Sequence, residues 1–425
     1  MKANKCKIGL WLLATYVGLT VITTLLLWGV YSIPREKLYP QMVSSVSLLE
    51  EEGKYPSIPY FRSKVRDNYS DAAMLNIAFG AQEGTLMDNL RNAMRSNEPM
   101  TEEEIEGLKL AVSQYPNIPE SVPYGRYWHG YQVYLRPLLT VFDLSQLRII
   151  NYILLFGITC IMLRLMWRKL GMWYALMMLL ALLSVAYPWV PQCMHFSSIF
   201  YVGMISMIVS MLIAGRTNEP VLRPILFFLS GAITSCLDLL TAPMIPLVLL
   251  LLTDTLMHKY EGTTKQQFWR RIGDLVGYGV IWCVGYALFW VTKFAVGSLI
   301  LDTNLFVDGL NQTATRMDAS FVPFSSWALK VLVFPFKHNY TLLLSGMAVM
   351  YVFLRWNKYR LAIINNAWLL VVAMIEPVWL LLLRQHTVIH YVIFVWRSEI
   401  ILVLCLSLFV YRVISQTKAN EKSIQ

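Results

Sequence analysis

An acidic residue in the long polar segment near the N-terminus, Asp71, is placed where it could act as a base. It follows Ser70 in a stretch, residues 70–78, that predicts a short helix with Ser70 as its N-cap. The helix dipole favours the ionised form of an acid in the first turn. Such a carboxylate can accept the proton of an attacking hydroxyl. The alternative is an acid that only stabilises a helix end on a solvated loop.

Two histidines and an arginine form a second group near the C-terminus. His386 and His390 are four residues apart and share one face of a helix, and Arg397 falls near the same stripe. These groups could hold a phosphate or pyrophosphate, which arginine binds in a bidentate manner. One alternative is a pair of interfacial histidines beside an arginine that reaches toward lipid headgroups. A zinc site is another, because histidine pairs at this spacing bind metal. Arg397 lies inside an apolar run, which favours the internal anion site.

An aromatic and basic stretch, residues 126–139, precedes the second long apolar run. Aromatic faces stack on sugar rings and arginines bind phosphates, although aromatic residues also populate membrane interfaces. Later in the chain, Asp238 and Thr241 stand at the mouth of another apolar run. A buried Asp238 needs a partner. It could contact the substrate, or it could form an ion pair that holds the loop against the membrane domain.

The candidate site therefore has one catalytic residue and nine binding residues. The catalytic base is Asp71. The residues expected to bind the substrate or its phosphate are Arg126, Tyr127, His129, Arg136, Asp238, Thr241, His386, His390 and Arg397.

The composition shows which elements must position these groups. Of 425 residues, 56% are hydrophobic and only 15% are charged, whereas soluble proteins carry about 25% charged residues. Many apolar runs reach the roughly 20 residues that cross a bilayer. This excludes a soluble enzyme, a disordered protein and a coiled coil. We expect an all-α integral membrane protein with about ten transmembrane helices, at residues 9–33, 147–166, 171–188, 196–214, 222–241, 243–258, 274–300, 339–355, 361–383 and 390–411.

Basic residues in the short loops set the orientation. With both termini in the cytoplasm, every short loop that carries a cluster of lysine and arginine lies on the cytoplasmic side. The formal net charge of +10 is then a cytoplasmic excess and does not indicate a nucleic-acid partner. The first apolar run, Ile8 to Ile33, is too long for a signal peptide and is expected to remain as a transmembrane helix.

The expected organisation has six parts. They are a first transmembrane helix (1–33), a large extracytoplasmic loop with short helices (34–146), transmembrane helices 2–7 (147–301), a second extracytoplasmic segment with an interfacial helix (302–338), transmembrane helices 8–10 (339–412) and a cytoplasmic tail (413–425).

Local signals refine the two outer segments. Thr101 to Glu104 form a capping box that opens a helix ending near Ser113. The prolines at 116, 119 and 123 then favour extended chain. Trp327 to Phe336 is too short to span and is expected at the membrane interface.

Several kinds of chemistry have no signature here. The six cysteines show neither a disulfide framework nor a metal spacing. There is no P-loop, GxGxxG or GxSxG motif, and no DxD pair in the outer loops. No cofactor is expected, and a divalent metal is not supported by further ligands.

The layout resembles the GT-C superfamily of integral-membrane glycosyltransferases. The residues that carry the resemblance are Asp71, Arg126 to Tyr131, Leu135 to Leu138, Leu237 to Pro243, and His386 to His390 followed by Arg397. The resemblance implies an outward-facing active site and a polyprenyl-phosphate-linked sugar as donor. It also implies that Asp71 is the catalytic residue of the first loop, and that the two histidines and Arg397 lie at the donor-phosphate end.

We therefore expect transfer of a sugar to an extracytoplasmic hydroxyl of a glycan or lipid-linked glycan, with inversion by one displacement. The expected setting is a bacterial plasma membrane, among its lipids. A lipid or polysaccharide transporter or flippase is one rival, which predicts charges at the bilayer midplane. A membrane O-acyltransferase is another; it could use His390 but leaves Asp71 without a role. The sequence does not define an oligomeric state.

Overall fold

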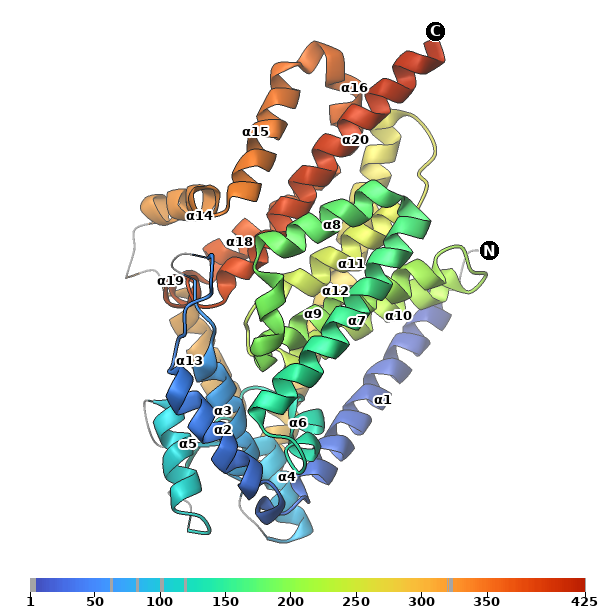
Figure 1. Ribbon diagram of the computed structural model, residues 1–425. Coiled ribbons are helices and arrows are strands. Elements are labelled where there is room, and N and C mark those ends of the chain that lie inside the picture. The colour runs from blue at the N-terminus through green and yellow to red at the C-terminus, as the bar shows by residue number, and fades with distance from the viewer. Residues whose placement is uncertain are drawn as a thin grey trace.

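In the computed structural model, described for residues 5–61, 64–81, 84–99, 103–117, 121–318, 320 and 324–424, the chain is almost wholly helical. Long helices form a bundle, and a layer of shorter helices covers one end of it (Figure 1). The two strands in these ranges, β1 (Asn97–Pro99) and β2 (Ser121–Pro123), form a short antiparallel pair. The helical class expected from the composition is therefore confirmed.

Six helical segments of the described ranges are long and apolar enough to cross a membrane. They are α1 (Lys5–Tyr31), α7 (Leu144–Leu170), α9 (Met194–Ile213), α10 (Glu219–Leu237), α12 (Thr264–Leu301), and Val395–Glu421, which joins η3 (Val395–Glu399) to α20 (Ile400–Ile424). These helices are the ones expected of a protein embedded in a membrane.

The other four expected spans form different structures. Three are apolar helices of 13 to 15 residues, shorter than the roughly 20 that cross a bilayer: α8 (Met172–Ser184), α11 (Met244–Met257) and α15 (Tyr340–Leu354). The fourth is a chain of α16 (Trp356–Asn366), α17 (Trp368–Ala373) and α18 (Ile375–Leu382), bent by 62°. The span number and the orientation thus stay predictions.

The segment expected as the large loop is a packed helical layer. It contains η1 (Arg35–Lys37), α2 (Tyr39–Glu52), α3 (Asn68–Phe79), α4 (Leu86–Arg95), α5 (Glu104–Ser113) and α6 (Gln132–Leu138). Leu49, Met74, Leu75, Phe79 and Leu108 form part of its buried core. In Figure 1 the helices α2, α3 and α5 lie at the end of the molecule away from both labelled termini.

Two expected helix starts in this layer differ in detail. α3 begins two residues before Ser70, and its N-cap is Asp67, whose carboxylate accepts a hydrogen bond from the Ser70 backbone N–H. Asp67 was missed because Ser70 is an equally good capping residue in sequence. The other helix, α5, begins at Glu104 with Glu103 as N-cap and no side-chain cap bond. Thr101, the expected cap, lies outside the described residues.

Glycine allows the layer and the membrane helices to approach closely. A Cβ at Gly130 would overlap Cys236 at the end of α10, and the Gly130 N–H donates to the Cys236 carbonyl. Within the bundle, Gly231 of α10 and Gly285 of α12 pack against each other's helix backbone, where a methyl group would not fit. These contacts fix the C-terminal end of α10, from which Asp238 follows.

The segment expected as the second extracytoplasmic one contains α13 (Leu305–Met317) and α14 (Phe324–His338), and α14 includes the expected interfacial run Trp327 to Phe336. Further on, α19 (Arg384–His390) carries both C-terminal histidines, whose ring centroids are 4.6 Å apart as expected for one helix face. The helix ends at His390, however, and Arg397 belongs to η3. The expectation of one continuous stripe through Arg397 was therefore wrong.

Candidate active site

Asp71 connects the helical layer to two membrane helices. Its side chain is fully buried, and its Oδ1 accepts a hydrogen bond of 2.8 Å from the Met194 backbone N–H at the start of α9. Its Oδ2 lies 3.5 Å from Nη2 of Arg148 in α7. The position in the first turn of α3 is the expected one, but a solvated loop acid, the alternative reading, does not fit this burial.

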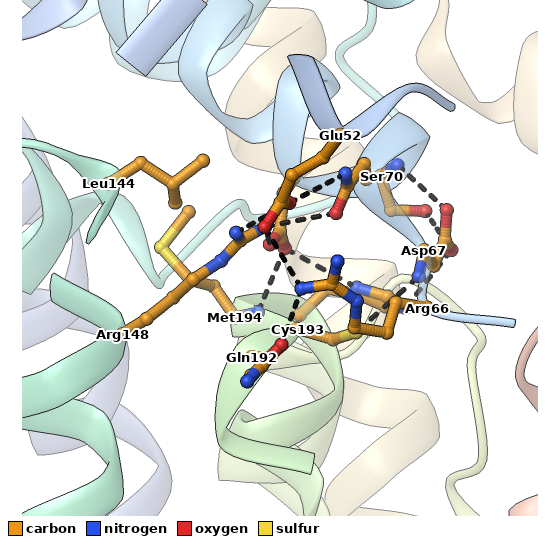
Figure 2. Close-up of polar contacts among 12 residues, drawn as sticks. Glu52, Arg66, Asp67, Ser70, Leu144, Arg148, Gln192, Cys193 and Met194 are labelled. Carbon is orange, nitrogen blue, oxygen red and sulfur yellow. Dashed lines mark hydrogen bonds and ion pairs between the residues drawn. The ribbon is translucent and has the colours of Figure 1, made fainter. Parts of the chain in front are cut away.

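A network of charged residues includes the partner of Asp71, Arg148, and Figure 2 shows the contacts that Arg148 and Arg66 make with Glu52. Arg148 donates to Glu52 Oε2 over 2.8 Å and to Asn68 Oδ1 over 2.9 Å. Arg66 binds the second oxygen of Glu52 at 3.1 Å and also the side chain of Gln192, in η2 (Tyr187–Gln192). The network joins α2, α3, α7 and η2, so it holds the polar layer against the bundle.

This network predicts a pH dependence for docking of the layer. Burial alone would raise the pKa of Glu52, but hydrogen bonds and charge from Arg148, followed by Asn68 and Arg66, outweigh it and hold that pKa below 4.5. A carboxylate whose pKa is lower in the folded than in the unfolded protein stabilises the folded form when the pH is above its unfolded-state pKa. This stabilisation is lost as the pH falls through the folded-state pKa. We expect the protease sensitivity of residues 34–143 to rise below about pH 4.5. The rise should be smaller in the Glu52→Gln variant, which lacks the titrating carboxylate.

His195 lies between two acids of the layer. Its Nε2 is 3.4 Å from Asp67 Oδ2, and its Nδ1 is 3.8 Å from Asp71 Oδ1. All three side chains are buried. His195 comes from the first turn of α9, so the end of one membrane helix presents an imidazole to a pair of carboxylates.

Two phenylalanine rings, Phe196 and Phe394, lie beside His195, and Phe394 also contacts the histidines of α19. The ring of Phe394 lies 5.7 Å from His195, 5.9 Å from His386 and 4.9 Å from His390. Phe196 lies 6.4 Å from Phe394. The structure thus gathers three histidines around Phe394, although they come from two distant parts of the sequence.

Arg397 is buried completely and contacts Phe196, one ring of this pair. Its guanidinium stacks over Phe196 at 4.9 Å and over Trp396 at 4.8 Å. Its Nη1 donates weakly to the Ile393 carbonyl at 3.4 Å. The alternative in which Arg397 extends to the headgroups is excluded by this burial.

The two α19 histidines differ from Arg397 in charge. Burial lowers the pKa of His386 to about 3 and that of His390 to about 4. Both imidazoles are therefore neutral near pH 7 and act as hydrogen-bonding groups. An anion bound beside them would raise both values, since it favours the charged form.

Many polar atoms of this region have no hydrogen-bond partner among the described residues. Buried groups of this kind are costly unless they are satisfied, so their concentration in one region indicates a site for a polar ligand. They are Asp71 Oδ2, both ring nitrogens of His195, Asp238 Oδ2, His386 Nε2, His390 Nδ1, Tyr127 Oη, and Arg397 Nε and Nη2.

Asp238 and Thr241 border the same region. The Thr241 backbone N–H donates to Asp238 Oδ1 over 2.8 Å, and His195 is close enough to act electrostatically on Asp238. Tyr127 is buried against Leu240. Three expected binding residues thus lie beside the histidine cluster.

His129, Arg136 and Arg126 bind other partners, although the ring of His129 contacts that of Tyr127 at 5.9 Å. His129 bonds to the Tyr131 hydroxyl at 2.8 Å and to the Tyr124 carbonyl at 3.0 Å, and burial lowers its pKa to about 3. Because a carbonyl only accepts, Nε2 of the neutral ring carries the proton.

Arg136 donates to the carbonyls of Val30, Ala78 and Ile33, so it joins α1 to the layer. Arg126 pairs with Asp308 at 3.6 Å and stacks on Tyr124. The structure does not bring Arg136 to the histidine cluster.

Four residues of the site were not among the catalytic and binding residues expected from the sequence: Glu52, Asp67, Arg148 and His195. Arg148 offered a signal, because a charged residue at the start of an apolar run is expensive unless it is paired. Within the described part of the chain, no three His, Cys, Asp or Glu side chains are arranged to hold a metal ion.

No protein-family model matches the chain, and neither a curated protein nor a solved structure matches it. The fold and the site define its class: a helical membrane protein in which a polar helical layer covers a buried cluster of acid, imidazole and guanidinium groups.

Proposed function

We propose that the chain is a membrane glycosyltransferase. It moves a sugar from a polyprenyl-phosphate donor to a hydroxyl of a glycan or lipid-linked glycan, on the extracytoplasmic side of a bacterial plasma membrane. One observation carries the proposal: Asp67 and Asp71 of the layer face His195 of α9, and buried polar atoms of Asp71, His195, His386, His390 and Arg397 lack hydrogen-bond partners in the described ranges. Transfer from a lipid phosphate needs this combination of a base and an anion-binding group.

The two oxygens of Asp71 have different roles in this mechanism. Oδ1 is held by the Met194 N–H, and Oδ2 takes the proton of the acceptor hydroxyl as its oxygen attacks the anomeric carbon. The bond from that carbon to the phosphate oxygen breaks, and the lipid phosphate leaves with the electron pair. Arg397 stabilises the leaving charge, with His386 and His390 as hydrogen-bond donors. A single displacement inverts the anomeric centre.

The proposal is tested with purified protein in phosphatidylcholine vesicles. A radiolabelled polyprenyl-phosphate sugar is offered with a glycan acceptor, and an acyl donor is offered in a parallel reaction. Labelled sugar on the acceptor, with an inverted anomeric centre, is the expected result. Acyl transfer, or movement of the lipid-linked sugar between leaflets without transfer, would replace the proposal with one of its rivals.

Replacing Arg397 tests the donor-phosphate assignment. Arg397→Gln should raise the KM for the lipid-linked donor at least about tenfold, because a hydrogen bond to a charged group contributes about 1.5 to 3 kcal/mol. Arg397→Lys should recover part of the affinity, since it restores the charge but not the planar fork. Arg164→Gln, an exposed arginine of α7, is the control. An unchanged donor KM in a folded Arg397→Gln protein would remove Arg397 from the site.

A further inference from the structure

A cavity of about 710 Å³ lies beside the buried cluster, and it is lined by basic groups together with apolar side chains. Lys64, Lys337 and His338 supply its basic groups, and Leu180 and Leu183 of α8 supply part of its apolar wall. Trp396 and Glu399 of η3, the neighbours of Arg397, also line it. The cavity combines basic groups with apolar surface, the two properties that an anionic amphiphile requires.

The basic groups act on one another across this cavity. Burial lowers the pKa of Lys64 to about 8, and the charges of Glu399 and Arg397 also act on it. Burial, then Lys64 and Lys337, hold the pKa of His338 below its ordinary value. Glu399 is the opposing charge on the wall, but its oxygens already accept hydrogen bonds from Tyr391 and from Asn339. Lys64 also faces the charge of Glu399 and lies over the rings of Tyr391 and Trp396, so the exposed Lys337 is the more accessible of the two lysines.

An apolar groove continues from this cavity along the bundle. A neighbouring cavity of about 600 Å³ shares Leu180 and Thr341 with it and runs between α8, α15 and α20. On α20 its lining extends from Ser407 to Lys418, a rise of roughly 16 Å, which is about the depth of one leaflet. The three helices contact one another, and Figure 1 shows them together in the bundle.

The surface around the groove is apolar and open. Leu344 is 65% exposed and Trp173 is 54% exposed, and both line the groove. Tyr60 and Tyr340, at the basic end, are also exposed. Exposed aromatic residues of this kind lie at the headgroup level of membrane proteins. The groove is thus open along its side, and exposed tyrosines of the kind found at membrane interfaces border its basic end.

We infer that the groove between α8, α15 and α20 binds a membrane lipid with a phosphate headgroup, the phosphate resting on Lys64 and Lys337 and the chain lying along Trp173 and Leu344. Charge complementarity selects the headgroup, and the continuous apolar wall selects a lipid over a free anion. This inference goes beyond the proposed function, because it needs no sugar transfer and no acceptor.

The probe is a photoactivatable phosphatidic acid with a diazirine in its chain, compared with the matching phosphatidylcholine, in phosphatidylcholine vesicles that contain the full-length protein. We expect preferential labelling by phosphatidic acid, with the modified peptides on α8, α15 and α20. Lys337→Gln should lower that preference roughly fivefold, as expected for one basic residue near an anionic lipid. Lys64→Gln should do the same if it folds.

Lys330→Gln is the matched control, because Lys330 is an exposed lysine of the same helix that lines a different cavity. It should label like the unmodified protein. Equal labelling by both lipids, or an unchanged preference in Lys337→Gln, would overturn the inference. If added inorganic phosphate alone abolished the labelling, the basic groups would bind a free anion. That result would overturn the inference as well. The assay contains no sugar donor, so a negative result would count against the lipid-binding inference and not against the transferase proposal.

Discussion

Replacing Asp71 with asparagine should abolish sugar transfer. Asparagine is nearly the same size and can still accept the Met194 N–H bond, so the contact between α3 and α9 can be kept. It cannot take a proton from the acceptor hydroxyl. Loss of a general base lowers the rate by roughly 10²- to 10⁴-fold. The measurement is transfer of labelled sugar by reconstituted protein at saturating donor.

Asp67→Asn separates the base from a structural acid. Asp67 also faces His195, but its carboxylate is engaged by the backbone and hydroxyl of Ser70 as the cap of α3. We expect this variant to lose stability by about 1 kcal/mol and to keep most of its transfer rate. Full activity of Asp71→Asn, or loss of activity only in Asp67→Asn, would contradict the assignment of Asp71.

Replacing Arg148 with methionine should release the polar layer from the bundle. Arg148 is 7% exposed and contacts Glu52, Asn68 and Asp71. Its removal leaves Asp71 without an arginine and Glu52 with Arg66 alone, and breaking a buried pair in this way costs about 3 to 5 kcal/mol. We expect a lower thermal midpoint and faster proteolysis in residues 34–143. These are measured in vesicles by melting and by limited digestion.

Two further variants show whether this effect comes from the network. Arg91→Met removes an exposed pair with Asp88 in the same layer and should cost less than about 1 kcal/mol. Combining Arg148→Met with Glu52→Gln should cost less than the sum of the single changes, because the two residues are in contact. Strict additivity, or normal protease resistance in Arg148→Met, would show that the network does not hold the layer.

Much of the candidate site followed from local chemistry. Asp71 is in the first turn of its helix, and His386 and His390 share a face, because helix geometry depends on spacing alone. Continuation of that face to Arg397 was wrong, because α19 ends at His390. Where a helix ends inside an apolar segment depends on the surrounding packing, and composition does not determine it.

Other parts of the site have no signal in the sequence. His195 and Asp67 are separated by more than a hundred residues and meet because α9 begins where α3 is docked. The aromatic and basic residues around them in the sequence predicted that Arg136 and His129 bind the substrate. Their hydrogen bonds instead go to backbone carbonyls of other segments and, for His129, to a tyrosine. Which partner a polar side chain finds is decided by the fold.

The sequence by itself determined the membrane class and the separation of a polar layer from apolar helices, because both follow from the free energy of transferring side chains into lipid. It also determined which residue types were available for proton transfer and anion binding. Only the tertiary structure decided that short or bent helices lie where four of the spans are expected, and that Asp67 and Asp71 of the layer meet His195 of α9, which shares Phe394 with the histidines of α19. The physical reason is that buried polar groups must find partners, and close packing selects among distant segments the ones that can supply them.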